Sequence, residues 1–283
     1  MRKSTILRAA LCAAALVAPA TVLAHSTKAA LNGPNVITAS ADGTAIWQFP
    51  DKRALDPAIF GTPKAPLNTD LLPLKMRATN AARTAYTTTA KPGPFSNNIK
   101  MITGNVTISS DDRTPLDGPG SKDRVALRAE FDGPQGQTYL VVMNKVIPKG
   151  PDHNFFGGVG TNMLMHGNTG IGTPLVTTEF SYITAWGVGD LYIDGEKTDT
   201  NRIVHVMVSE RTRDEAFKVG FGVARPKDLE VHVILPPRKV SPNGPVKSPV
   251  PTGVTLPNGM EQPFIHVNFY GNARMTGNPL WNS

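Results

Sequence analysis

Three histidines occur in nearly identical settings, each between two aliphatic residues. They are His205 in Val204–Val206, His232 in Val231–Val233 and His266 in Ile265–Val267. Side chains alternate between the two faces of a strand, so the aliphatic neighbours belong on the core face and each imidazole on the other. Neutral imidazole is a common ligand for copper and zinc. If the three strands are neighbours, the histidines form a platform for a metal ion. The alternative is three half-exposed histidines that share no site.

Methionines near the histidines indicate which metal such a platform would take. One run is Met163-Leu164-Met165-His166, and another is His205-Val206-Met207. Thioether sulfur is a soft ligand that favours Cu(I). We therefore predict a copper site built from His166, His205 and Met207, with Met165, His232 and His266 as further candidates. The alternative is that these methionines only fill the core.

A second hypothesis is a metal-dependent enzyme. The three strand histidines would hold zinc or iron and leave a coordination position open for water, with Asp190 or Glu210 as base. Glu210 lies at an odd offset from His205, which places the two on opposite faces of one strand and weakens a direct pair. The sequence contains no Gly-x-Ser-x-Gly elbow and no His-Glu-x-x-His motif. A binding protein without catalytic chemistry is therefore favoured over an enzyme.

A third hypothesis needs no metal. Trp186 and Tyr182 are predicted to share one strand face, and Asp190 follows at or near a turn. Such residues are suited to lining a pocket for a small apolar or carbohydrate-like ligand.

The elements that must position these residues are predicted to be strands. Alternating patterns indicate strands over 100–109, 124–131, 138–147, 180–186, 191–193, 201–210, 217–223, 229–235 and 264–273, with two short strands over 36–48 around Ala41-Asp42-Gly43. The 124–147 stretch is predicted to be a hairpin, and Asp194-Gly195 a turn. With hardly any helical period, the pattern predicts an all-β, single-domain antiparallel β-sandwich or barrel with long Pro/Gly-rich loops.

Three stretches are predicted to lack long strands. The N-terminal part of the mature chain, 25–98, is read as irregular and is Pro-rich from residue 50 onward. The stretch 149–174 is dense in glycine and is read as a loop. The stretch 236–263 is rich in Pro, Gly and Lys and is read as a long exposed loop.

The N-terminus is typical of a secretory signal peptide. Arg2, Lys3 and Arg8 precede an apolar run over 9–17, and small residues continue to Ala24. The run is shorter than the about 20 residues that a membrane span needs. We predict a signal peptide over 1–24, cleavage after Ala24, and a single β-rich domain over 25–283 in a periplasmic or secreted protein with no membrane span.

The amino-acid composition narrows the range of possible binding partners. The chain carries 29 basic and 22 acidic residues; without the three basic residues of the signal segment, the mature charge is 26 − 22 = +4. Dense basic blocks with interleaved aromatics are absent from the sequence, so we expect no nucleic-acid partner. The single cysteine, Cys12, lies in the signal segment, so the mature protein can form no disulfide. The expected partner is a small ligand or a metal ion: copper, with zinc or iron as alternatives, or no metal at all.

Overall fold

The computed structural model of the protein describes residues 34–113, 121–147, 158–220, 224–278 and 280–281. Strands dominate these residues, which confirms the predicted all-β class. The longer strands are β1 Asn35–Gln48, β6 Ile99–Asp112, β7 Arg124–Asp132, β8 Thr138–Val146, β9 Val159–Met165, β10 Glu179–Ile193, β11 Glu196–Arg211, β12 Arg225–Leu235 and β15 Ile265–Phe269. The short elements are helix α2 Pro57–Phe60, 3-10 helix η1 Leu74–Met76, and strands β2 Gly61–Thr62, β3 Ala65–Pro66, β4 Arg77–Thr79, β5 Tyr86–Thr89, β13 Arg238–Ser241, β14 Gly244–Lys247 and β16 Arg274–Thr276.

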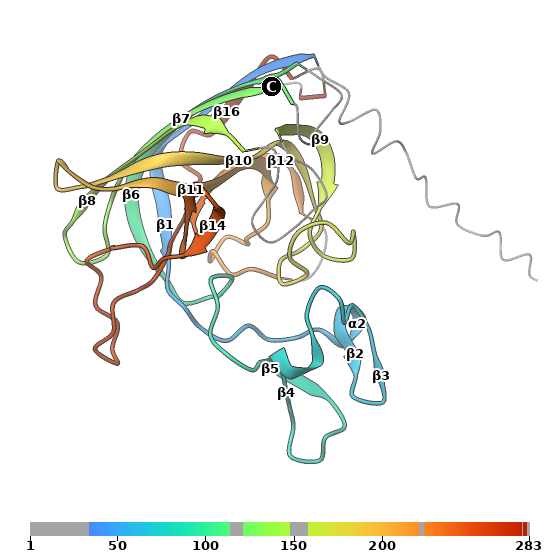
Figure 1. Ribbon diagram of the computed structural model, residues 1–283. Coiled ribbons are helices and arrows are strands. Elements are labelled where there is room, and N and C mark those ends of the chain that lie inside the picture. Colours follow the sequence, from blue (N-terminus) through green and yellow to red (C-terminus); the bar gives the residue numbers. More distant parts are fainter. Residues whose placement is uncertain (1–33, 114–120, 148–157, 221–223, 279, 282–283) are drawn as a thin grey trace, which may run out of the picture.

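Eight of the strands close into a ring (Figure 1). In order around the ring they are β1, β6, β7, β8, β10, β11, β12 and β15, and β15 pairs with β1 again. Every pairing is antiparallel, and the ring order follows the chain order. The sheet is therefore an up-and-down barrel, the closed form of the predicted fold.

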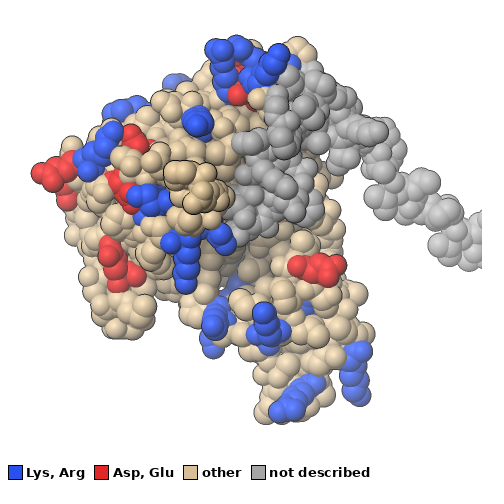
Figure 2. Space-filling model, in the orientation of Figure 1, with Lys and Arg blue, Asp and Glu red and all other residues tan. Residues whose placement is uncertain are grey.

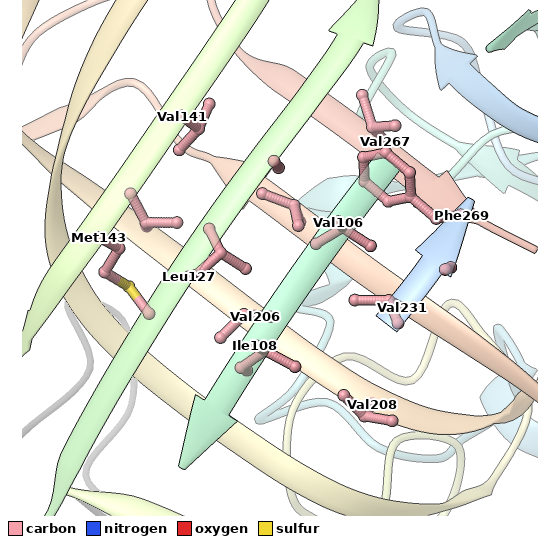
Figure 3. Close-up of a cluster of buried hydrophobic side chains, with 14 of the residues drawn as sticks. Val106, Ile108, Leu127, Val141, Met143, Val206, Val208, Val231, Val267 and Phe269 are labelled. Carbon is pink, nitrogen blue, oxygen red and sulfur yellow. The ribbon is translucent and has the colours of Figure 1, made fainter. Parts of the chain in front are cut away.

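The barrel interior is apolar. Alternate residues of each strand, such as Val206 and Val208 on β11 and Val231 on β12, point into one buried cluster (Figure 3). Trp47, Phe131, Tyr139 and Phe269 add aromatic rings to this cluster. Because side chains alternate, the residues between these positions face the outside of the barrel.

The structure corrects the predicted strand boundaries in two places. β1 is one continuous strand across Asp42 and Gly43, which stay paired with Asn105 and Gly104 of β6. β10 is likewise one strand where two were predicted, with a bulge between Ser181 and Ile183.

The predicted loops also need correction. The described part of the glycine-dense stretch contains strand β9, which pairs with the first half of β10. The stretch 236–263 is not simply an exposed loop, because it contains the β13–β14 hairpin and packs against the barrel. Thr252 is fully buried and its carbonyl accepts a hydrogen bond from the Tyr139 hydroxyl at 2.5 Å. The strand predicted over 217–223 is reduced to one bridge between Arg213 and Val219 in the described residues.

Residues 49–98 form a small lobe beside the barrel (Figure 1). The lobe contains α2, η1 and strands β2 to β5, and has its own apolar cluster that includes Phe60 and Leu72. The Arg77 guanidinium lies inside the lobe and donates hydrogen bonds to the carbonyls of Phe60, Leu67, Asn68 and Leu72. One arginine thus organises a segment with few long strands of its own.

The described residues contain no helix long and apolar enough to cross a membrane. The predicted signal peptide over 1–24 lies outside the described residues.

Candidate functional site

The three strand histidines lie on adjacent strands of the barrel. His205 is on β11, His232 on β12 and His266 on β15, and these strands pair in that order. The aliphatic neighbours of each histidine belong to the interior cluster, so each imidazole faces outward. The alternation in the sequence therefore gave the correct face, and the closure of the barrel brings the three strands together.

The rings form a row across four strands, which we call the histidine row: Trp186, His205, His232, His266 and Phe95. Trp186 stacks on His205 with ring centroids 4.3 Å apart. His205 meets His232 edge-on at 5.7 Å, and His232 stacks on His266 at 4.6 Å. Phe95 from the lobe closes the row, edge-on to His266 at 5.4 Å.

The row is buried although it lies outside the barrel. Each of the three histidines is 6 % exposed or less. The segments over this face, which we call the cover, are residues 94–97, 166–178 and 212–220. Arg53 holds two of them, because its guanidinium donates to the carbonyls of Leu175 and Gly220, each at 3.0 Å. The site is thus enclosed by the lobe and by two loops of the barrel.

Hydrogen bonds determine which ring nitrogen carries the proton in two of the histidines. His205 Nδ1 lies 3.0 Å from the Ala185 carbonyl, and His266 Nδ1 lies 2.8 Å from the Pro94 carbonyl. A carbonyl oxygen only accepts, so Nδ1 carries the proton in each ring, and in the neutral ring Nε2 carries the lone pair. The Nε2 atoms of His232 and His266 are buried and have no hydrogen-bond partner within the described ranges.

Burial also keeps two of these rings neutral. Burial first, and then the nearby His266 and His205, hold the pKa of His232 well below 6.5. Burial and the charge of Arg213 do the same to the pKa of His266. Both rings therefore present unprotonated nitrogens in neutral solution.

Two buried glutamates lie beside the histidine row. Glu179 Oε1 lies 2.5 Å from His166 Nδ1, and Glu179 Oε2 accepts a hydrogen bond from the Ser209 hydroxyl at 2.6 Å. Glu230 accepts hydrogen bonds from the Thr212 hydroxyl at 3.0 Å and from the Asn268 amide at 3.2 Å. Burial, followed by the charge of Glu179, raises the pKa of Glu230 to about 7.

A buried cation balances these carboxylates. Arg213 donates to the Gln48 side chain and, at 2.8 Å, to the Ser96 carbonyl. Gln48 in turn donates to Asn268 at 2.5 Å, which connects the arginine with Glu230. A hollow of about 10 Å³ remains among these groups. It is lined by His166, His232, His266, Glu179, Glu230, Asn268, Gln48, Arg213, Phe95, Val176 and Thr212. This volume is about what one water molecule or one ion requires.

The predicted methionines lie on the same side of the barrel. Met163, Met165 and Met207 form a buried cluster with Trp186 and Ile171. Met207 is paired across the strands with His232, so their side chains are direct neighbours on the outer face. Of the six residues predicted to bind metal, His166, His232 and His266 line one hollow, while His205, Met207 and Met165 lie in the adjacent row and cluster.

The imidazoles do not converge on a single point. No group of three or more His, Cys, Asp or Glu side chains within the described ranges is arranged to hold a metal ion. A zinc or iron enzyme with three histidine ligands requires such a group. The strand histidines form a stacked row instead, and the three-histidine enzyme stays a prediction.

The residues predicted to line an apolar pocket are separated. Trp186 stacks on His205 on the outer face, whereas Tyr182 belongs to the interior cluster and contacts Trp281. The bulge after Ser181 shifts the alternation between them, so the prediction of one shared face was wrong. Asp190 lies elsewhere, in an ion pair with Lys197 at 2.8 Å. Glu210 accepts a hydrogen bond from the Phe180 amide at the strand end and does not pair with His205 in the described contacts.

Four important residues of the site were missed by the sequence analysis: Glu179, Glu230, Arg213 and Gln48. Only Glu230 carried a local signal, because Glu230-x-His232 places both side chains on one strand face. The other three come from segments far apart in the chain, and their proximity follows from the barrel closure and the cover.

Comparison of the chain with protein-family models, with curated proteins and with solved structures finds no match.

Proposed function

We propose that this chain is an exported binding protein that holds a copper ion at the histidine row, with the Nε2 atoms of His232 and His266 and the thioether of Met207 as ligands. The observation that carries the proposal is the pair of buried Nε2 atoms on neighbouring strands, which have no hydrogen-bond partner in the described part of the chain. A buried polar atom without a partner costs about 1–3 kcal/mol, and a bound ion would remove that cost.

The surroundings of His266 and His166 fit a metal-binding role. Histidine ligands usually donate their other ring nitrogen to a carbonyl or a carboxylate, which orients the ring. His266 does this with Pro94, and His166 has the carboxylate of Glu179 at its Nδ1. Because the pKa of His232 and His266 is lowered, protons compete weakly for their nitrogens.

The choice of copper rests on the ligand set. Two imidazoles and a thioether are three ligands at most, and a thioether favours Cu(I) over zinc or iron. Met207 is fully buried and is the cross-strand neighbour of His232. The location outside the cytoplasm rests on the signal-like N-terminal residues alone.

The experiment is a Cu(I) competition titration of the mature protein under reducing conditions, with elemental analysis of protein prepared without chelators. We expect one copper per chain in the wild type. His232→Gln, His266→Gln and Met207→Leu should each weaken the affinity by at least about tenfold.

Met260→Leu is the matched control for the loss of a thioether, since Met260 is largely exposed. Cleavage after Ala24 leaves His25 as the first residue, where its free amine and a ring nitrogen can also chelate copper, so His25→Gln is tested in parallel. Equal copper affinity in the wild type and in His232→Gln, with both proteins folded, would refute the site. Stoichiometric zinc or iron in place of copper would refute the choice of metal.

A further inference from the structure

In the described part of the chain, no segment covers one half of the outer barrel surface. The outward side chains of β1, β6, β7 and β8 are mainly small and polar, and many are exposed, among them Thr103, Asn105, Thr107 and Ser109 on β6. The opposite half, which carries the histidine row, is buried under the lobe and the loops. The bare half is therefore the part of the sheet open to a partner.

Two hollows of about 510 Å³ each lie on this bare face. Successive segments of the same four strands line them, so the hollows lie one after the other along the strands. On β6, for example, 107–109 line the first and 103–105 line the second.

The two hollows are lined by side chains of opposite charge, and Arg128 of the first forms an ion pair with Glu130 of the second within one copy. The charged side chains among the described residues lining the first are Arg128 and Arg274, with no acidic residue. The second is lined by Asp42, Glu130 and Asp132, with no basic residue among those described. The same order holds on two strands of the face. Arg128 precedes Glu130 and Asp132 along β7, and Arg274 lies beside Ser40 of β1, one outward position before Asp42.

We propose that the bare face of β1, β6, β7 and β8 binds the same face of a second copy of this chain. A two-fold axis that runs across the strands between the hollows reverses the strand direction. It therefore places the basic hollow of one copy over the acidic hollow of the other. Each strand then faces the same strand of the second copy. On β7, Arg128 meets Glu130 and Asp132 of the second copy. Arg274 of β16, which lies beside β1, meets Asp42 on β1 of the second copy.

The charge pattern selects a second copy over other occupants. A closed two-fold contact must be self-complementary, and a face with one basic and one acidic half meets this condition in one orientation. A polar face with exposed ion pairs gives a weaker contact than an apolar one, and salt screens it. The dimer should therefore dissociate on dilution and in high salt. This inference is independent of copper binding, because the histidine row lies on the other half of the barrel.

The test is sedimentation velocity of the full mature chain over a range of concentrations, at low and high salt. The variants are Arg274→Asp, Asp42→Arg and the double variant that carries both. Each single reversal should weaken dimerisation by at least about tenfold, and the double variant should restore it, because the exchanged charges again meet across the two-fold axis. Arg83→Asp, on the exposed part of the lobe, is the control and should leave the dimer unchanged.

Three results would overturn the proposal. The first is a wild type that stays monomeric up to about 1 mM at low salt. The second is a dimer that both single reversals leave intact. The third is a dimer that the single reversals break and the double variant does not restore, because a contact of another geometry would behave in that way.

Discussion

The imidazoles of His232 and His266 stack at 4.6 Å across the β12–β15 pair, and the buried Nε2 of each has no hydrogen-bond partner among the residues that the structure describes. Both rings have a pKa well below 6.5 in the folded protein, mainly because they are buried. In the unfolded chain they titrate near 6.5. Below about pH 6.5 the unfolded state therefore binds protons that the folded state does not.

The two histidines should therefore lower the stability of the metal-free protein as the pH falls below about 6.5, whereas Glu230 and Asp112, whose pKa values are raised to about 7, oppose this loss. Each of the two histidines is expected to contribute about 1.4 kcal/mol per pH unit. His232→Gln removes one of the two groups and should reduce the acid dependence by that amount. Urea unfolding of both proteins between about pH 5 and 8 measures how the free energy of unfolding of each depends on pH. Identical pH slopes in the two proteins would show that the His232 ring is protonated in the folded state.

Asp112 should produce a pH dependence of the opposite sign. Asp112 is fully buried at the end of β6, and among the described residues only the Thr161 hydroxyl, at 2.7 Å, donates a hydrogen bond to its carboxylate side chain. Burial, and after it the charges of Asp123 and Asp111, raises the pKa of Asp112 to about 7. Between about pH 4 and 7 the unfolded state releases a proton that the folded state keeps, so stability falls as the pH rises through that window.

Asp112→Asn should remove the loss of stability that the wild type shows as the pH rises from about 4 to 7. An amide oxygen accepts the Thr161 hydrogen bond as the acid does, so the variant should be more stable than the wild type at pH 7, by up to about 4 kcal/mol. Asp228→Asn is the control, because Asp228 is exposed on β12 and is not among the charges that raise the pKa of Asp112. Chemical denaturation at about pH 4 and 7 measures the difference. A wild type and an Asp112→Asn variant that respond equally to pH would contradict the neutral Asp112.

Features that depend on the alternation of side chains within one strand could be predicted from the sequence. Features that depend on which strands pair when the barrel closes could not. The outward direction of His205, His232 and His266 follows from their aliphatic neighbours, and the structure places them accordingly. That they are adjacent depends on the β11–β12–β15 pairing, which no local pattern encodes.

Local patterns also gave two wrong predictions. Asp42-Gly43 has the composition of a turn, yet the strand continues because Gly43 faces Gly104 of β6 and takes a φ of 106° within the pairing. The bulge after Ser181 separates Tyr182 from Trp186, although even spacing placed them on one face. A bulge adds one residue to one strand only, and its position depends on the partner strand.

Arg77 should be essential for the lobe over 49–98. Its guanidinium donates to the carbonyls of four residues, and it lies over the rings of Phe60 and Tyr86 at 5.4 and 5.0 Å. A lysine keeps the charge but cannot reach this set of acceptors with one ammonium group. Arg77→Lys should cost about 3 kcal/mol and expose the lobe to protease, measured by limited proteolysis with mass spectrometry.

The control for this prediction is Arg83→Lys, since Arg83 is exposed on the same lobe. Cleavage within 49–98 should increase in the Arg77 variant and not in the control. If both variants resisted protease as the wild type does, the apolar cluster around Phe60 would hold the lobe without the arginine.

Alanine substitutions at Gly172 and Gly170 distinguish the cost of backbone strain from the cost of disturbing the packing of His166. Both glycines have positive φ values, 75° and 77°. A Cβ at Gly172 would lie 2.4 Å from Cδ2 of His166, whereas a Cβ at Gly170 meets nothing within 4 Å. Gly170→Ala should therefore cost only the left-handed strain, about 1–2 kcal/mol.

Gly172→Ala should carry that strain and also displace the His166 ring from Glu179. The buried Glu179 carboxylate then loses its imidazole partner, which adds about 1–3 kcal/mol. Thermal and urea unfolding of the two variants measures the difference. Equal destabilisation by the two alanines would show that the His166–Glu179 contact adds nothing to folding, and a larger effect of Gly172→Ala would assign that contact to the stability of the site.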